Sequence, residues 1–365
     1  MLEWLGHGGD WLTFAERYPE APFAIDFSAN INPLGPPAAV REQWPRLWPA
    51  LTRYPDPRQR RLGAKLAAKH GIAAPHVLVT NGGAEAIDLL MRALRPRKVG
   101  VVEPCFSEYR QAAERVGAHV VARFVSESTE GFVIPVSLVE QLLEEVDVLI
   151  LGNPNNPTGV LWERHQLLAL ADRAARCRCH LLLDEAFLDF LPQEDRLTMI
   201  PAVSRYAHVS VVRSLTKMYA IPGLRLGYLV AGEALVARCR KLQTPWSVNG
   251  VAEHVGQMVL DDGDFVARTR QWLTQERRWF VGALREKLAD WLEPVPMPGS
   301  VNYLLLKLRR SGWTDLKLQH RLAERGIFIR ACRTFPGMGE SYVRIAVRLR
   351  EENERFIAVM RQLMV

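Results

Sequence analysis

Short apolar runs alternate with segments of helical periodicity between about residues 75 and 240. In the segments 84–94 and 164–176, apolar residues recur every three or four positions, which predicts amphipathic helices. Strands and helices in alternation predict an α/β architecture, with a mostly parallel sheet covered on both faces and a ligand site at the strand ends. The runs that we interpret as buried strands are VLVT (77–80), VGVVE (99–103), VLILG (148–152), HLLLD (180–184), VSVVR (209–213) and LGYLV (226–230).

The pattern changes near residue 246. A long helical stretch at about 264–289 is followed by the proline-rich break EPVPMPG (293–299). Further strands and helices then alternate with a different spacing, which predicts a smaller α+β domain. Its elements are expected at 302–308, 315–325, 327–330, 342–347 and 351–363.

The first 45 residues have no clear period and contain Pro33, Pro36 and Pro37. They predict an irregular arm that joins the small domain. The expected divisions are the arm at 1–45, a large domain at 46–245 and a small domain at 246–365.

Composition narrows the class of protein without identifying it. The 365 residues are 48% hydrophobic and 24% charged, as in a globular protein, and no apolar run approaches the roughly 18 residues of a membrane helix. The first residues lack a secretory signal, and the five cysteines form no paired framework, so we expect a cytoplasmic protein. Cys177, Cys179 and His180 have no second ligand cluster, so no metal site is predicted. The net charge of +7 comes from scattered residues, which does not favour nucleic-acid binding.

The segment SLTKMYAIPGLRLGY (214–228) places Lys217 after two hydroxyl residues, Ser214 and Thr216, and eight residues before Arg225. Burial at a strand end disfavours the ammonium form of a lysine, and the neutral amine is the form that attacks an aldehyde. The hydroxyls and the arginine can hold a phosphate through charge-assisted hydrogen bonds. The alternative is a surface loop whose lysine and arginine are merely solvated.

Two further loops follow predicted strands. In DEAFLDF (184–190), Asp184 can pair with a protonated pyridine nitrogen, or it can simply cap the following turn. In NPNNPTG (153–159), Asn156 can donate to a phenolate oxygen, or the segment can be an ordinary turn-rich loop.

The segment TNGGAEAI (80–87) is predicted as a strand end, a glycine pair and a helix start. Backbone N–H groups at a helix start bind phosphate, aided by the helix dipole. A nicotinamide-binding turn has the same order, although the G-x-G-x-x-G pattern is absent.

Phosphate turn, amide loop, carboxylate and lysine follow one another at the ends of strands of one predicted sheet. This order resembles the aspartate-aminotransferase-like pyridoxal-phosphate (PLP) enzymes of fold type I over nearly the whole chain. The resemblance implies that Lys217 carries PLP as a Schiff base, Asp184 pairs with the ring nitrogen and Asn156 with the ring oxygen. It also implies that the PLP phosphate is bound by Gly83, Ala84, Ser214, Thr216 and Arg225.

The same resemblance assigns three aromatic positions. Phe106, in EPCFSEY, would stack on the PLP ring, with Tyr109 as the second candidate. Tyr54, in RYPDP, matches a tyrosine that reaches the cofactor of the neighbouring subunit, which implies a homodimer with shared active sites. Phe187 stands where the family commonly has a tyrosine that contacts the ring oxygen, so one hydrogen bond is expected to be lost.

Within this fold, the chain is similar to the branch that contains histidinol-phosphate aminotransferases and L-threonine-O-3-phosphate decarboxylases. The stretches HGG (7–9), DFSANINPLGPP (26–37) and PWSVN (245–249) resemble the decarboxylases in particular. The resemblance implies an arm folded over the site. It places His7, Asn32 and Asn156 near a small phosphorylated amino acid whose phosphate and carboxylate are held by Arg330 and Arg344.

The expected reaction is decarboxylation of L-threonine O-3-phosphate to (R)-1-amino-2-propanol O-phosphate and CO₂, which supplies the aminopropanol linker of cobalamin. Substrate orientation on the ring decides between this reaction and amino transfer, and single residues do not reveal it. Histidinol-phosphate aminotransfer with 2-oxoglutarate therefore stays an alternative. A PLP-fold protein without catalysis is a second alternative, against which the intact Lys217 and Asp184 argue.

Overall fold

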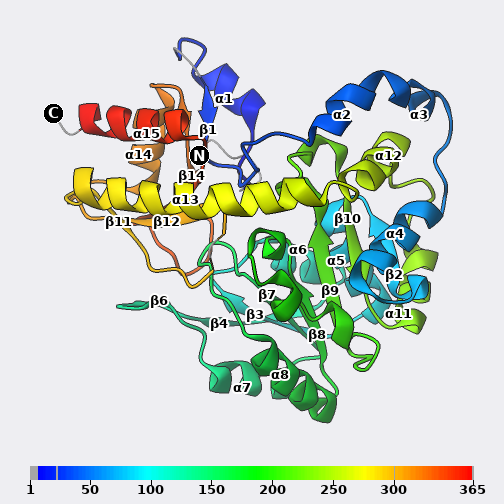
Figure 1. Cartoon of the computed structure of the whole chain (residues 1–365). Coiled ribbons are helices and arrows are strands. Elements are labelled where there is room, and N and C mark those ends of the chain that lie inside the picture. The colour runs from blue at the N-terminus through cyan, green and yellow to red at the C-terminus, as the bar shows by residue number, and fades with distance from the viewer. Residues whose placement is uncertain (1–6, 22–23, 300, 364–365) are drawn as a thin grey trace.

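The computed structural model describes residues 7–21, 24–299 and 301–363. Its centre is a seven-stranded sheet with the order β2-β10-β9-β8-β7-β3-β4, in which β10 is antiparallel to both its neighbours and the other pairs are parallel (Figure 1). The strands are β2 (Val77–Thr80), β3 (Lys98–Glu103), β4 (His119–Phe124), β7 (Val148–Gly152), β8 (His180–Asp184), β9 (Val209–Ser214) and β10 (Gly227–Val230). The predicted mostly parallel α/β sheet is confirmed.

Helices cover both faces of this sheet because its strands are apolar on both sides. Leu182 of β8 joins the core formed with α5, α6 and α11, whereas Leu181 and Leu183 join the core on the opposite face, formed with α4, α7, α8 and α12. The covering helices are α4 (Arg60–His70), α5 (Gly82–Leu94), α6 (Glu108–Arg115), α7 (Val136–Glu145), α8 (Arg164–Cys177), α11 (Glu233–Leu242) and α12 (Gly250–Val259).

A smaller four-stranded antiparallel sheet, with the order β11-β12-β15-β14, lies in the C-terminal part of the chain. The expected α+β arrangement is present, and its strands lie close to the predicted positions. The elements are α13 (Gly263–Lys287), β11 (Leu292–Pro294), β12 (Tyr303–Leu308), α14 (Asp315–Ala323), β13 (Ile327–Phe328), β14 (Arg330–Ala331), β15 (Tyr342–Ala346) and α15 (Arg350–Leu363).

Helix α13 runs across the molecule from the small sheet to the large domain (Figure 1). It begins after Asp262, whose side chain accepts a hydrogen bond from the Phe265 N–H, and it contacts β11 and α15 as well as the η3 turn (Leu188–Phe190) beside the large sheet. Helix α12, in contrast, packs against α4 of the large domain. It also packs against two short helices that precede α4, namely α2 (Ala38–Gln43) and α3 (Trp48–Thr52). We propose from these contacts that the boundary between the two domains lies in α13.

The N-terminal arm, predicted to be irregular, contains a short strand and short helices. Strand β1 (Ile25–Asp26) pairs with β13, and α1 (Trp11–Arg17) buries Phe14 against Phe328. Helices α2 (Ala38–Gln43) and α3 (Trp48–Thr52), joined by the 3-10 turn η1 (Trp44–Leu47), then cross to α12. Each of these short helices buries at most one residue, so it leaves no apolar period in the sequence. Residues 1–6 and 22–23 of the arm lie outside the described residues.

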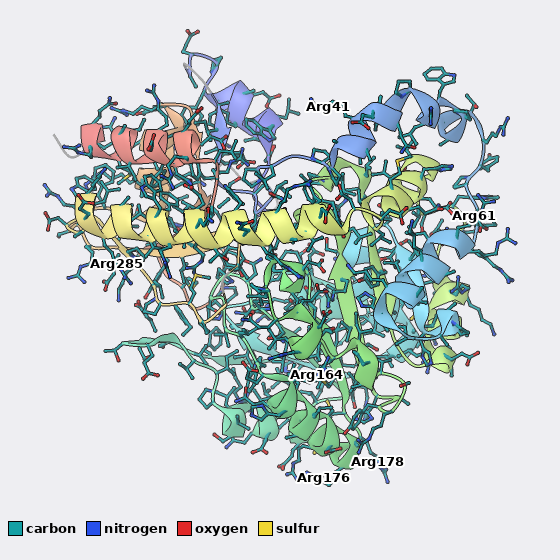
Figure 2. The ribbon with its side chains drawn as sticks, in the orientation of Figure 1. Arg41, Arg61, Arg164, Arg176, Arg178 and Arg285 are labelled. Atoms are coloured by element: carbon teal, nitrogen blue, oxygen red, sulfur yellow. The ribbon has the colours of Figure 1, made fainter. Side chains whose placement is uncertain are left out.

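Basic side chains are spread over the surface (Figure 2). The labelled arginines lie at separate places around the molecule, on α2, on α4, on α13, and on or just after α8. They do not form a continuous basic stripe. They are Arg41, Arg61, Arg285, Arg164, Arg176 and Arg178.

Among the described helices, none is both long and apolar enough to cross a lipid bilayer.

Candidate active site

The carboxyl ends of four parallel strands bring the predicted motifs to one edge of the large sheet. Strand β2 leads into α5, β7 into the loop 153–159, and β9 into α10 (Leu215–Met218), which carries Lys217. Asp184, at the end of β8, is paired in register with Gly152 of β7 and Val212 of β9. The motifs therefore meet where an α/β sheet binds its ligands.

Lys217 lies in a pocket of hydroxyl groups. Its Nζ donates to Thr216 Oγ1 at 2.9 Å and lies 3.5 Å from Ser214 Oγ. Burial lowers the pKa of Lys217 to about 8, helped by the positive charge of Arg225 and opposed by Asp184. A neutral amine, the nucleophilic form, is thus accessible close to neutral pH.

A cradle for an anion lies beside Lys217, at the start of α5. Arg225 adopts a left-handed conformation (φ 56) and reaches Gly82 so closely that a Cβ there would lie 2.7 Å from its Nη2. Gly82 itself has φ +80, so two constraints require glycine at this position. The opening N–H groups of α5 at Gly83 and Ala84, the Arg225 guanidinium and the hydroxyl pair can together hold a phosphate. That hydroxyl pair, Ser214 and Thr216, is joined by a 2.7 Å hydrogen bond.

Asp184 is buried with both carboxylate oxygens in use. Oδ1 accepts the Ala186 N–H at 3.0 Å, and Oδ2 accepts the hydroxyl of Tyr109 at 2.8 Å. Burial raises the pKa of Asp184, while these two donors and Lys217 act in the opposite direction. Tyr109 is thus committed to Asp184, and its ring meets Phe106 edge-on at 5.7 Å. Phe106 is left as the candidate to stack on a ligand ring.

Phe187 packs its ring against Tyr303 at 5.2 Å, and the Tyr303 hydroxyl donates to the Asn155 carbonyl. The phenyl ring of Phe187 has no polar atom to offer a ligand. The expected loss of one donor at this position is consistent with this packing.

Two arginines of the small sheet complete the opposite side of the site. Arg344 donates to Asn156 Oδ1 at 2.6 Å and to the Ser28 carbonyl at 2.7 Å. Arg330, opposite Arg344 in the β14–β15 ladder, donates to Thr334 Oγ1 at 2.6 Å. Both guanidinium groups are buried, and directly paired residues of an antiparallel ladder emerge on the same face.

The arm brings His7 to the large domain. His7 Nε2 lies 3.0 Å from Glu108 Oε1, and its ring centroid lies 5.5 Å from that of Phe106. The hydrogen bond from His7 is the largest influence lowering the pKa of Glu108. His7 is therefore placed beside the candidate stacking ring.

Asn32, predicted to contact substrate, is engaged within the protein. Its backbone N–H donates to the Lys217 carbonyl at 3.1 Å, and its buried side-chain amide donates to the Met218 carbonyl at 2.8 Å and to Thr269 Oγ1 at 3.0 Å. Asn30, two residues earlier, is also buried, and its Oδ1 has no hydrogen-bond partner among the described residues. The sequence analysis did not single out Asn30, whose amide oxygen we consider a further candidate for contact with a ligand.

Tyr54 lies apart from these groups. It is 82% exposed, and its ring packs on that of Trp246 at 4.7 Å. Its ring therefore makes no contact with the site residues described above.

A buried ionic network supports the site from behind. Arg213, next to Ser214, bonds to Glu185, Asp189 and Glu194 at 2.8–2.9 Å and is fully buried. Because side chains alternate along a strand, Glu185 and Arg213 point away from the face that Asp184 and Ser214 occupy. The network thus ties together the ends of β8 and β9.

The cysteine and histidine residues weighed as metal ligands do not converge. His180 is hydrogen-bonded to Ser210 Oγ at 2.8 Å. No group of three His, Cys, Asp or Glu side chains suited to a metal is found in the part of the chain that the structure describes.

The chain belongs to the aminotransferase class I and II family, which matches residues 24–360. It is 40% identical to the threonine-phosphate decarboxylase of Salmonella typhimurium over 364 residues, covering 98% of this chain and 96% of that protein. The solved structure of L-threonine-O-3-phosphate decarboxylase from Porphyromonas gingivalis is similar, with a TM-score of 0.80, 26% identity and coverage of 93% and 98%. Histidinol-phosphate aminotransferase from Clostridium acetobutylicum has a TM-score of 0.83, 27% identity and coverage of 92% and 98%. The predicted fold type and branch are confirmed.

Proposed function

We propose that this chain is a PLP-dependent decarboxylase that converts L-threonine O-3-phosphate to (R)-1-amino-2-propanol O-phosphate and CO₂. The observation that carries the proposal is the 40% identity to a threonine-phosphate decarboxylase over nearly the full length of both chains. The product would serve as the aminopropanol linker of cobalamin.

The residues at the sheet edge fit PLP. Gly82 lets the Arg225 guanidinium approach the start of α5, an arrangement that suits a phosphate group, and Lys217 provides an amine with a pKa of about 8. Asp184 offers a carboxylate to a pyridinium nitrogen, and Asn156 offers its amide N–H to a ring oxygen. When bound, PLP supplies an electron sink for the pair of electrons left behind by CO₂.

Lys217 then has a second task at the substrate. As a neutral amine it can accept a proton, and as an ammonium group it can return one to Cα after CO₂ has left. Its pKa of about 8 keeps both forms populated near neutral pH. The neighbouring Thr216 hydroxyl, 2.9 Å from Nζ, orients the amine.

Arg330 and Arg344 are proposed to hold the substrate's phosphate and carboxylate. Their burial on one face of the β14–β15 ladder strengthens an ion pair with an anionic ligand, because little water competes. We assign His7 and Asn30 to the same substrate pocket, since one lies beside Phe106 and the other has an amide oxygen without a partner among the described residues.

We also propose a homodimer with shared active sites. Tyr54 and the tryptophans of η1 and α3 leave an apolar surface open to a second copy: Trp44 is 55%, Trp48 69% and Tyr54 82% exposed. Sedimentation should give twice the chain mass. Mixed dimers of Lys217→Ala and Tyr54→Phe chains should regain activity in one of their two sites, whereas a monomeric enzyme would show no such complementation.

The cytoplasmic location stays part of the proposal. All five cysteines are free thiols in the structure, as a reducing compartment requires. Fractionation of cells that produce the tagged chain should recover it with cytoplasmic markers.

The reaction is tested by supplying PLP-loaded protein with L-threonine O-3-phosphate and measuring released CO₂. A parallel assay with histidinol phosphate and 2-oxoglutarate measures glutamate, because the Clostridium acetobutylicum aminotransferase shares the fold at a TM-score of 0.83. CO₂ without glutamate supports the decarboxylase. Glutamate without CO₂ would overturn it in favour of amino transfer, and a protein that neither binds PLP nor turns over would favour a non-catalytic role.

A further inference from the structure

We propose that Tyr109 is a positioning residue that holds Asp184 in place, as an anion, for the ring nitrogen of the cofactor. This inference rests on the proposed cofactor and concerns a residue that makes no contact of its own with substrate. Its starting point is the 2.8 Å hydrogen bond from the Tyr109 hydroxyl to Asp184 Oδ2.

Tyr109 has no competing role. Its side chain is 2% exposed, and the hydroxyl lies in the space left by Gly152, where an added Cβ would come within 3.2 Å of it. Gly152 is paired with Asp184 across β7 and β8, so the missing side chain opens a path from α6 to the end of β8. Glycine at 152, tyrosine at 109 and aspartate at 184 thus form one arrangement.

The direction of the hydrogen bond is fixed by the chemistry. Burial and then the charge of Asp184 raise the pKa of Tyr109 well above its ordinary value, so its hydroxyl keeps its proton and donates. A buried carboxylate with fewer donors becomes more basic. Among the described residues, the Ala186 N–H is the other hydrogen-bond donor to Asp184, so loss of the tyrosine hydroxyl removes one of these two donors.

The consequence reaches the nitrogen that joins Lys217 to the cofactor. A more basic Asp184 would hold more tightly the proton that it shares with the ring nitrogen. The ring would then withdraw less electron density. The linking nitrogen becomes more basic, and its absorbance transition moves to higher pH. The electron sink weakens as well, so kcat falls while substrate binding through Arg330 and Arg344 is retained.

The test is a pH titration of the visible absorbance of PLP-loaded Tyr109→Phe protein, without substrate. We expect the midpoint to rise by about 0.5–1 pH unit and kcat to fall about tenfold, as for loss of one hydrogen bond to a charged group, with KM within about twofold. Tyr303→Phe is the matched control, because it removes a buried hydroxyl that donates to the Asn155 carbonyl and not to Asp184. Its midpoint should match that of the unmodified protein.

A Tyr109→Phe midpoint equal to that of Tyr303→Phe would overturn the inference. If Tyr109→Phe does not fold, Gly152→Ala provides a second test, since the new Cβ would lie 3.2 Å from the same hydroxyl, as well as 3.1 Å from Asn155, and should move the midpoint the same way by a smaller amount. No shift in a folded Gly152→Ala protein would then overturn the inference. An unmodified protein that shows the absorbance but releases no CO₂ would contradict the proposed reaction alone, whereas one that binds no PLP would overturn both.

Discussion

The two sides of the site are built by different means. On the large-domain side, Asp184 and Lys217 follow directly from β8 and β9, whose ends are fixed by ladder register and by the Arg213 network behind them. On the other side, His7, Asn30 and Arg344 come from the arm and the small sheet and meet the large domain through a few side-chain contacts, such as the bond of Arg344 to Asn156. We propose that the sheet edge holds the cofactor. The other side, which we call the composite wall because it combines residues of the arm and of the small sheet, would then select the substrate.

The largest effect should come from the sheet edge. Lys217→Ala is expected to lower turnover by at least about three orders of magnitude, because it removes the amine that we propose to carry the cofactor and to move the proton. The visible absorbance of bound PLP should disappear with it. Lys241→Ala, on the exposed side of α11, is the control, and turnover in Lys217→Ala comparable to that control would refute the assignment of the lysine.

Substitution of a residue in the composite wall should impair substrate binding and leave cofactor binding intact. Arg344→Ala is expected to lower kcat/KM about 100-fold or more, as for truncating one partner of a buried charge pair, while PLP absorbance is retained. Arg309→Ala is the control, since that arginine forms an exposed pair with Glu293. If Arg344→Ala lost PLP with unchanged KM, the division into a cofactor side and a substrate side would be wrong.

Burial of Lys217 at the sheet edge should also carry an electrostatic cost. The pKa of Lys217 is about 8 when folded and about 10.5 when unfolded, so the unfolded chain binds more protons between these values and stability rises with pH there. Below pH 8 the cost is complete. For the cofactor-free protein, Lys217→Met should therefore increase the free energy of unfolding at pH 7 by up to about 2–3 kcal/mol relative to its effect at pH 10.5. Urea unfolding at both pH values measures this, and a pH-independent difference would contradict it.

The smallest effect separates two asparagines of the arm. Asn30→Ala is expected to raise KM about tenfold with little change in stability, since one substrate hydrogen bond is worth about 1.4 kcal/mol. Asn32→Ala should instead destabilise the protein by about 1–3 kcal/mol, because the buried Met218 carbonyl and Thr269 hydroxyl would lose the hydrogen bonds that the Asn32 amide donates to them. Thermal unfolding and KM for both variants decide the matter. A raised KM with unchanged stability in Asn32→Ala would restore the original assignment.

The same contrast explains what the sequence could predict. The strands of the large sheet can be recognised in the sequence as apolar runs. Residues at or shortly after the end of such a run lie at the edge of the sheet, so the positions of Asp184 and Lys217 could be predicted without a structure. The roles of Asn30, Asn32 and Tyr109 depend on contacts between segments more than 70 residues apart, such as the bond of Tyr109 to Asp184. Nothing in the local pattern of SANIN or CFSEY distinguishes a side chain that meets a ligand from one that supports its neighbour.

The pairing of Arg330 with Arg344 has a consequence for how relatives of this chain can diverge. The two arginines share a face because β14 and β15 are held in one register. A single inserted residue within either strand would turn one guanidinium to the opposite face. A change of length just after β14 would also disturb the hydrogen bond of Arg330 to Thr334. Among descendants that keep the substrate, insertions and deletions should therefore be purged from the two strands and from the residues that directly follow β14.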